Sequence, residues 1–161
     1  MTAPTKLLLA LAVPFYALDQ ATKWWVVKHI EFNADPEPVI ENFFYLCHWG
    51  NTGAAFSMFH NNNAAFIVLS IAALIGLVVA YCRDAFKDTP SRVGVGLLVG
   101  GILGNLSDRI IHGHVVDFLL FNLHVRYANP WPAFNVADSC ICVAAGLFIL
   151  GSFKKTPDPS A

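Results

Sequence analysis

Charged residues are scarce in this sequence. Only 13% of the 161 residues are Asp, Glu, Lys or Arg, and the formal net charge is −1. A soluble globular domain carries about 25% charged residues, so this chain has about half the charge that normally covers a surface in water. The near-neutral balance excludes a nucleic-acid-binding protein that relies on a basic face, and it excludes an acidic disordered protein.

Cysteine is also rare, and its placement excludes a disulfide framework. Among the four cysteines, Cys47 alone lies outside the long apolar stretches. Cys140 and Cys142 are two residues apart on one predicted helix, where their side chains diverge. We therefore interpret all four as small apolar side chains that fill packing space.

Apolar side chains are abundant instead. Hydrophobic residues make up 56% of the chain, and the mean hydropathy is +0.54. Four apolar stretches fall at about 7–27, 64–82, 93–111 and 133–153, and each has the roughly 20 residues that cross a ~30 Å hydrocarbon core as a helix. The first stretch lacks a small-x-small cleavage pattern, so we expect it to be retained. The sequence thus predicts an all-α membrane protein with four transmembrane helices in a single domain, 1–161.

The distribution of basic residues orients these helices. The loop and ends on one side carry six basic residues, whereas the loops on the other side carry two, Lys28 and Arg126. The positive-inside rule places the first side, with both termini, in the cytoplasm. The six residues are Lys6, Arg83, Lys87, Arg92, Lys154 and Lys155. The aromatic residues expected near the outer interface are Trp24, Trp25, Trp49, Tyr127 and Trp131.

The outer segment between the first two spans is too aromatic for a slack linker. We predict short strands at Val39–Ile40 and Phe43–Trp49, broken by Glu41–Asn42 and Gly50. They would form a small β-element resting on the membrane, within about residues 30–60. The conformation of the second outer segment, 112–132, stays open from the residues alone.

Charged side chains inside a bilayer cost at least ~2.5–3.5 kcal/mol each, so their positions call for a reason. Asp117 follows the third span, and Asn51 precedes the second on the same outer side. We expect Asp138 about six residues into the fourth span, ~9 Å below its outer start. The costly residues inside the spans that call for explanation are Asp19, Asp108, Arg109 and Asp138. Together with Asn51 and Asp117, they are expected in the outer leaflet.

Several of these residues have structural explanations. Asp108 and Arg109 can neutralise each other, with Asn105 one turn earlier on the same helix face. Asp19 can pair with Lys23 four residues later.

The glycines have structural explanations too. Gly96, Gly100 and Gly104 recur every four residues, a pattern typical of close helix packing. Gly53 is expected to mark a turn.

Asp117 and Asp138 are harder to explain structurally, because neither has a basic residue at helical spacing. Asn135, three residues before Asp138, can hydrogen-bond to it. Two carboxyl groups that face each other in a low-dielectric pocket share a proton, since both cannot ionise easily. Such a pair can act as general base toward water and general acid toward a leaving amine, as in aspartic proteases. We therefore predict aspartyl chemistry with no metal and no cofactor.

Two other chemistries fit the sequence less well. His112, His114 and Asp117 form an H-x-H-x-x-D pattern that resembles a metal site, but no further ligand cluster accompanies it. Ser107 and Ser139 lie near the polar residues, but neither has the G-x-S-x-G context of a serine hydrolase nucleophile.

Five sequence blocks together resemble the lipoprotein signal peptidase (signal peptidase II) family of bacteria. Their order and spacing extend over nearly the whole chain. The blocks are LDQATK at 18–23, NTGAAF at 51–56, GGILGNLSDR at 100–109, GHVVDF at 113–118 and PAFNVADS at 132–139.

The resemblance implies a catalytic dyad at Asp117 and Asp138. It implies four transmembrane helices in the bacterial inner membrane, an outward-facing β-cradle, and an outer helix or loop after the third span. It further implies cleavage of the signal peptide from diacylglyceryl-modified prolipoproteins, just before the lipidated Cys, by a site near the outer face. Membrane phospholipids and globomycin-type peptide inhibitors are the expected partners, and we expect a monomer. The residues expected to shape the site and bind substrate are Asp19, Lys23, Asn51, Asn105, Arg109 and Asn135.

Two other classes of function compete with this hypothesis. A small proton-coupled transporter would use intramembrane aspartates as a relay, but a relay should extend through both leaflets. A non-catalytic assembly subunit would tolerate loss of the aspartates.

Overall fold

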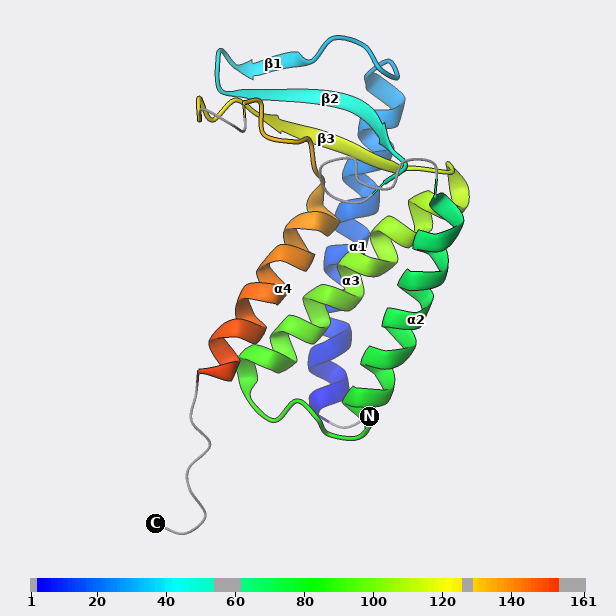
Figure 1. Cartoon of the computed structure of the whole chain (residues 1–161), viewed down its shortest axis with the longest axis vertical. Helices are drawn as coiled ribbons and strands as arrows, with labels where there is room; N and C mark the ends of the chain where they lie inside the picture. Colours follow the sequence, from blue (N-terminus) through cyan, green and yellow to red (C-terminus); the bar gives the residue numbers. More distant parts are fainter. Residues whose placement is uncertain (1–2, 54–61, 126–128, 154–161) are drawn as a thin grey trace.

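In the part of the chain that the structure describes, four helices form a bundle, and a small sheet lies at one end of it (Figure 1). The computed structural model describes residues 3–53, 62–125 and 129–153. The basic residues Lys154, Lys155 and Arg126 and the aromatic Tyr127 lie outside the described residues, as do the last three residues of NTGAAF, 54–56. The helices are α1 (Ala3–His29), α2 (Asn63–Cys82), α3 (Thr89–Ile111) and α4 (Val136–Ser152). The strands are β1 (Glu37–Ile40), β2 (Phe44–Asn51) and β3 (Val115–Phe121).

Glycines let α3 pack closely on two neighbouring helices. A Cβ atom on Gly100 would lie 2.9 Å from the backbone oxygen of Ala12 in α1. On the opposite side, a Cβ on Gly101 would lie 2.6 Å from the backbone oxygen of Ala137 in α4. The predicted packing role of the glycine repeat is therefore confirmed, and α3 lies at the centre of the bundle.

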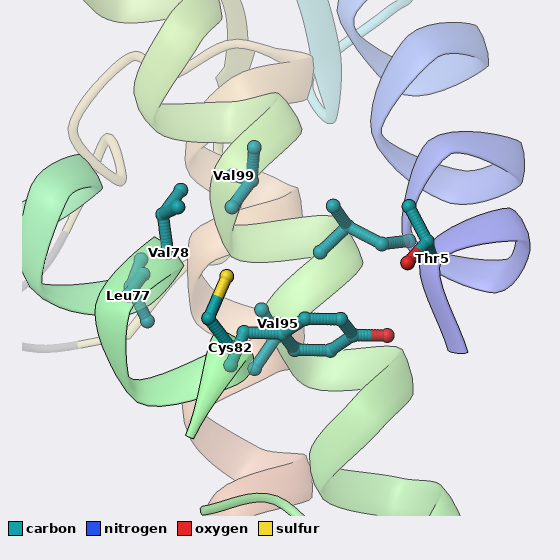
Figure 2. Close-up of a pocket in the computed structure, with 8 residues that line it drawn as sticks. Thr5, Leu77, Val78, Cys82, Val95 and Val99 are labelled. Atoms are coloured by element: carbon teal, nitrogen blue, oxygen red, sulfur yellow. The ribbon is translucent and has the colours of Figure 1, made fainter. Parts of the chain in front are cut away.

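Helix α2 packs against α3 and contains no buried residue. A helix that is apolar all round and remains uncovered suits a lipid environment. By length and composition, α2 and α3 can each cross a membrane, whereas α4 has 17 residues. At the end of the bundle away from the sheet, α1, α2 and α3 enclose an apolar crevice of about 180 Å³ (Figure 2). It is separate from the polar residues considered below.

The three strands form an antiparallel sheet in the order β1-β2-β3. The two strands expected near residues 39–49 are confirmed. The predicted break at Gly50 is wrong, because Gly50 lies within β2 and pairs with Val116 of β3. A Cβ at Gly50 would come within 2.9 Å of the His114 ring, so the glycine here permits a close side-chain approach.

Strand β3 occupies part of the outer segment whose conformation the sequence left open. The family resemblance implied a loop or a helix there, but Val115–Phe121 is a strand. Phe134, just before α4, exchanges backbone hydrogen bonds of 2.8 and 3.1 Å with Leu119 of β3. A buried cluster of Val26, Val116 and Phe118 attaches the strand to the end of α1. The start of α4 is thereby held against β3.

Helix α4 begins later than the fourth apolar stretch. Asn135 caps the helix, because its side chain accepts a hydrogen bond from the backbone N–H of Asp138 (2.9 Å). The Asp138 carboxylate in turn accepts a bond from the backbone N–H of Asn135 (3.2 Å). Asp138 therefore lies in the first helical turn, and the predicted depth of six residues is wrong.

Candidate active site

Asp117 lies on β3, and its buried carboxylate accepts two hydrogen bonds from side-chain amides. Asn51 at the end of β2 donates from Nδ2 to Oδ2 (3.0 Å), and Asn135 donates from Nδ2 to Oδ1 (2.9 Å). Only 4% of Asp117 is exposed. Antiparallel pairing sets Asp117 opposite Trp49, two residues before Asn51, so Asn51 and Asp117 share one face of the sheet.

Asp138 in α4 is held in a similar way. Asn105 of α3 donates from Nδ2 to Asp138 Oδ1 at 2.7 Å, and the backbone N–H of Asn135 donates to Oδ2. Asp138 is only partly buried, so the site is reachable from this side.

Asn135 connects the two aspartates. It is fully buried, donates its side-chain amide to Asp117, and contacts Asp138 through its backbone. Its Nδ2 also lies 3.2 Å from Asn105 Oδ1, which links both amides. Each carboxylate oxygen of Asp117 and Asp138 thus accepts one fixed hydrogen bond, which orients the pair.

The surroundings of Asp117 favour a bound proton. Burial, followed by the charge of Asp138, raises the pKa of Asp117 to about 7, although the hydrogen bond from Asn51 and the charge of Lys23 oppose the rise. Because the two groups interact, the proton belongs to the pair. At neutral pH the pair can therefore both accept and donate a proton, as general acid–base hydrolysis requires.

Lys23 is buried beside this pair and forms ion pairs with two other carboxylates, those of Asp19 and Asp108. Its Nζ lies 2.8 Å from Asp19 Oδ2 and 2.8 Å from Asp108 Oδ2. It also donates to Asn105 Oδ1 at 3.0 Å, which directs the amide Nδ2 of Asn105 toward Asp138. The predicted Asp19–Lys23 pair is confirmed.

The predicted neutralisation of Arg109 by Asp108 is wrong. Adjacent side chains on a helix point in different directions, so Asp108 faces Lys23 while Arg109 faces the chain after β2. Arg109 donates from Nη2 to the backbone oxygen of Gly53 (2.9 Å) and stacks over the Phe66 ring at 4.9 Å. The predicted turn at Gly53 is confirmed, because its N–H donates to Asn51 Oδ1 (2.9 Å). Arg109 thereby supports the segment that carries Asn51.

The remaining candidates have other contacts. The rings of His112 and His114 lie 6.1 Å apart, and within the part of the chain that the structure describes no cluster of three His, Cys, Asp or Glu residues could hold a metal. Ser107 bonds to Tyr16 (3.2 Å), and Ser139 donates to the backbone oxygen of Asn135 (3.0 Å).

Cys47 is another buried nucleophile candidate near the aspartates. Its Sγ contacts the backbone oxygen of Asp117 at 3.7 Å. Burial, followed by the charge of Asp117, raises the pKa of Cys47 to about 12, so the thiol keeps its proton at neutral pH.

The sequence did not predict the contacts of Gln20 and Asp108 in this network. Gln20 donates from Nε2 to Asp19 and Asp108 at 3.2 and 3.1 Å. Asp108 accepts a bond from the backbone N–H of Val116 (3.0 Å). Gln20 lies within the LDQATK block, which was the only available signal for it. The eight site residues expected from the sequence all lie in or beside this network.

A family model described as signal peptidase (SPase) II matches residues 11–154. The chain belongs to the signal peptidase II family. A lipoprotein signal peptidase of Neisseria meningitidis serogroup C (strain 053442) is 42% identical over 92% of this chain and 90% of its own length. Another, of Symbiobacterium thermophilum, is 39% identical over 88% of this chain and 91% of its own length.

Solved structures agree with this membership in the signal peptidase II family. A bacterial membrane enzyme is similar with a TM-score of 0.83 and 30% identity, over 94% of this chain and 92% of that one. A second has a TM-score of 0.80 and 32% identity, over 92% and 94% of the two chains. Signal peptidase II is an aspartic protease of bacterial membranes, and this membership does not favour the alternative of a small transporter.

Proposed function

We propose that this enzyme removes signal peptides from prolipoproteins by hydrolysis at Asp117 and Asp138. The observation that carries the proposal is the pair of carboxylates oriented by Asn51, Asn105 and Asn135. Family membership supports the reaction, and the geometry supports the assignment of residues.

Hydrolysis needs one carboxylate and one carboxylic acid. The ionised member takes a proton from water, whose oxygen attacks the carbonyl carbon of the residue before the lipidated Cys. The protonated member gives its proton to the nitrogen as the C–N bond breaks. Asp138 suits contact with the attacking water because it is the more exposed of the two, and the more buried Asp117 is then the member that holds the shared proton.

The enzyme crosses the membrane four times in this proposal. An uncovered apolar α2 and the length of α3 support two spans directly. Helix α1, with 27 residues, is about 40 Å long, and α4 runs beside α3. The excess of basic residues at the end away from the sheet supports cytoplasmic termini and an outward-facing sheet.

The proposed substrate is a prolipoprotein whose Cys already carries diacylglyceryl. A site where the sheet meets the helices receives a scissile bond at the bilayer surface while the signal helix and the acyl chains stay in lipid. We expect phospholipids around the helices and globomycin-type peptides as competitors at the dyad. The single domain, 1–161, acts as a monomer in this proposal, since the described residues of one chain supply both aspartates and all of their amide donors.

Purified enzyme tests this proposal directly. We expect it to release the signal peptide from a diacylated prolipoprotein in detergent and to leave a product that begins with the lipidated Cys. The matched substrate with Cys replaced by Ser, which carries no lipid, should remain intact. Cleavage at another bond, or equal cleavage of both substrates, would contradict the proposed specificity.

A further inference from the structure

Two buried carboxylates hold the backbone immediately before each proposed catalytic residue. Asp19 Oδ1 accepts a hydrogen bond from the backbone N–H of Ala137 at 2.8 Å, and Asp138 is the next residue. Asp108 Oδ2 accepts one from the backbone N–H of Val116 at 3.0 Å, and Asp117 is the next residue. The two contacts have the same form although they join α1 to α4 and α3 to β3.

Lys23 ties these two carboxylates together. Its Nζ is 2.8 Å from each of them, and its third hydrogen bond goes to Asn105. Gln20 also donates to both carboxylates. Asp19, Lys23 and Asp108 are 0%, 3% and 2% exposed, so this cluster is closed to water. All three protons of the ammonium group therefore have fixed partners.

Net stability is a poor explanation of the cluster. The cost of removing three charges from water offsets most of their mutual attraction. What the cluster does fix is distance, because charge-assisted hydrogen bonds are short and directional. The Asp19–Lys23–Asp108 cluster connects the backbone amide of Ala137 to that of Val116. It therefore fixes the spacing of the segments that carry Asp138 and Asp117.

We propose that Asp19 and Asp108, joined by Lys23, are positioning residues that set the separation of Asp117 and Asp138. This inference rests on the proposed function, since it assigns the two aspartates to the reaction. Asp19 positions the first turn of α4, and Asp108 positions β3. Neither contacts the reacting atoms.

The test combines local hydrogen exchange with kinetics on the full-length enzyme in detergent. In Asp108→Ala we expect faster amide exchange in peptides covering β3 and wild-type exchange in the first turn of α4. Asp19→Ala should give the reverse pattern, and Lys23→Met should accelerate exchange in both segments. Each variant should lower kcat by about 100-fold, the scale of a 1 Å misplacement, with little change in KM.

Isosteric variants separate positioning from simple loss of fold. Asp108→Asn and Asp19→Asn keep an oxygen that accepts the backbone N–H but lose the charge. Because charge-assisted bonds are about twice as strong as neutral ones, we expect these variants to retain roughly tenfold more kcat than the alanine variants. If an alanine variant does not fold, the asparagine variant of the same residue is used for the exchange measurement. We expect Asp108→Asn to accelerate exchange in β3 only, and Asp19→Asn to accelerate it in the first turn of α4 only.

Lys28→Met is the matched control, since Lys28 is exposed on the same helix and contacts the Trp24 ring. Wild-type exchange in both segments of the asparagine variants, or faster exchange spread equally over the whole chain, overturns the inference. So does wild-type kcat in Lys23→Met. If the wild-type enzyme does not cleave prolipoprotein, the proposed function is contradicted instead. The exchange pattern still tests whether the Asp19–Lys23–Asp108 cluster holds the two segments.

Discussion

At the scale of single residues, Asn105 and Arg109 lie one turn apart on α3 but contact different parts of the molecule. Asn105 stands between the Lys23 ammonium and the Asp138 carboxylate. Arg109 faces away from Lys23 and supports Gly53 and the Phe66 ring. Asn105 therefore orients Asp138 of the proposed dyad, whereas Arg109 supports the segment after β2.

We expect Asn105→Ala and Arg109→Ala to differ in melting temperature and rate. Asn105→Ala should lower kcat by about 100-fold, since the orientation of Asp138 is lost. Arg109→Ala should cost about 1.5–3 kcal/mol of stability, because a hydrogen bond from a charged group is lost. Arg83→Ala is the control for the loss of an arginine, because Arg83 is exposed just after the end of α2. Arg109→Ala with the parent's melting temperature and no activity would place Arg109 in substrate binding.

The raised pKa of Asp117 predicts how rate and stability depend on pH. The folded state holds this proton up to about pH 7, above the ordinary value of 3.8. The proton's contribution to stability is therefore fully present below 3.8 and is lost as the pH rises through about 7. We expect kcat to fall over the same upper range as the pair loses its shared proton.

Thermal melting tests the predicted direction of the pH dependence of stability. Asp117→Asn has no such proton, so its melting temperature relative to the wild type should rise between pH 4 and pH 8. A difference that stays constant over this range, or that falls, contradicts the assignment.

At the scale of elements, Gly104 is where α3 makes room for the site. A Cβ on Gly104 would overlap the Asp19 carboxylate and lie 3.1 Å from the Ala137 side chain. Asp19 would then lose its position against Lys23 and the Ala137 amide. A residue without chemistry of its own thus determines where the start of α4 lies.

Gly104→Ala should therefore damage the enzyme, whereas Gly76→Ala should not. We expect Gly104→Ala to cost about 1–3 kcal/mol from overpacking and to lower kcat. A Cβ on Gly76 of α2 meets nothing within 4 Å, so alanine there should stabilise by up to about 1 kcal/mol through helix propensity. Thermal melting in detergent beside turnover compares the two, and equal effects would contradict the close packing at Gly104.

The elements also show what the sequence could predict. Long apolar stretches located the four described helices to within a few residues, although three of the stretches contain charged residues. Strand β3 was missed because nearly all of Val115–Phe121 is buried, so the alternation that marks a half-exposed strand is absent. The start of α4 was missed because the capping pair of Asn135 and Asp138 lies inside an apolar run.

The residues of the candidate site could be predicted from the sequence, but many of their contacts could not. The free-energy cost of placing charged groups in a membrane drew attention to Asp117 and Asp138, and helical spacing predicted the Asp19–Lys23 pair. The partner of Asp108 was not predictable from neighbours in sequence, since Lys23 lies on another helix. Its contact with Val116 depends on how β3 docks on the bundle.

At the scale of the whole molecule, the proposed orientation can be tested by labelling single cysteines. In a background with all four native cysteines replaced by Ala or Ser, we expect activity to be kept, because the pKa of Cys47 rules out a thiolate. Asp35→Cys, on the sheet side, should react with a membrane-impermeant maleimide in intact spheroplasts. Lys87→Cys, between α2 and α3, should react only after permeabilisation. The opposite labelling pattern would reverse the orientation.

The central claim is that Asp117 and Asp138 together hydrolyse the prolipoprotein. Release of signal peptide by purified Asp117→Asn and Asp138→Asn, beside the wild type and Asp84→Asn, tests it most directly. Asp84 is an exposed carboxylate between α2 and α3, so Asp84→Asn controls for loss of a charge. We expect wild-type turnover in Asp84→Asn and a loss of at least about 1,000-fold in each dyad variant, with all proteins folded. Substantial turnover by either dyad variant would contradict the account.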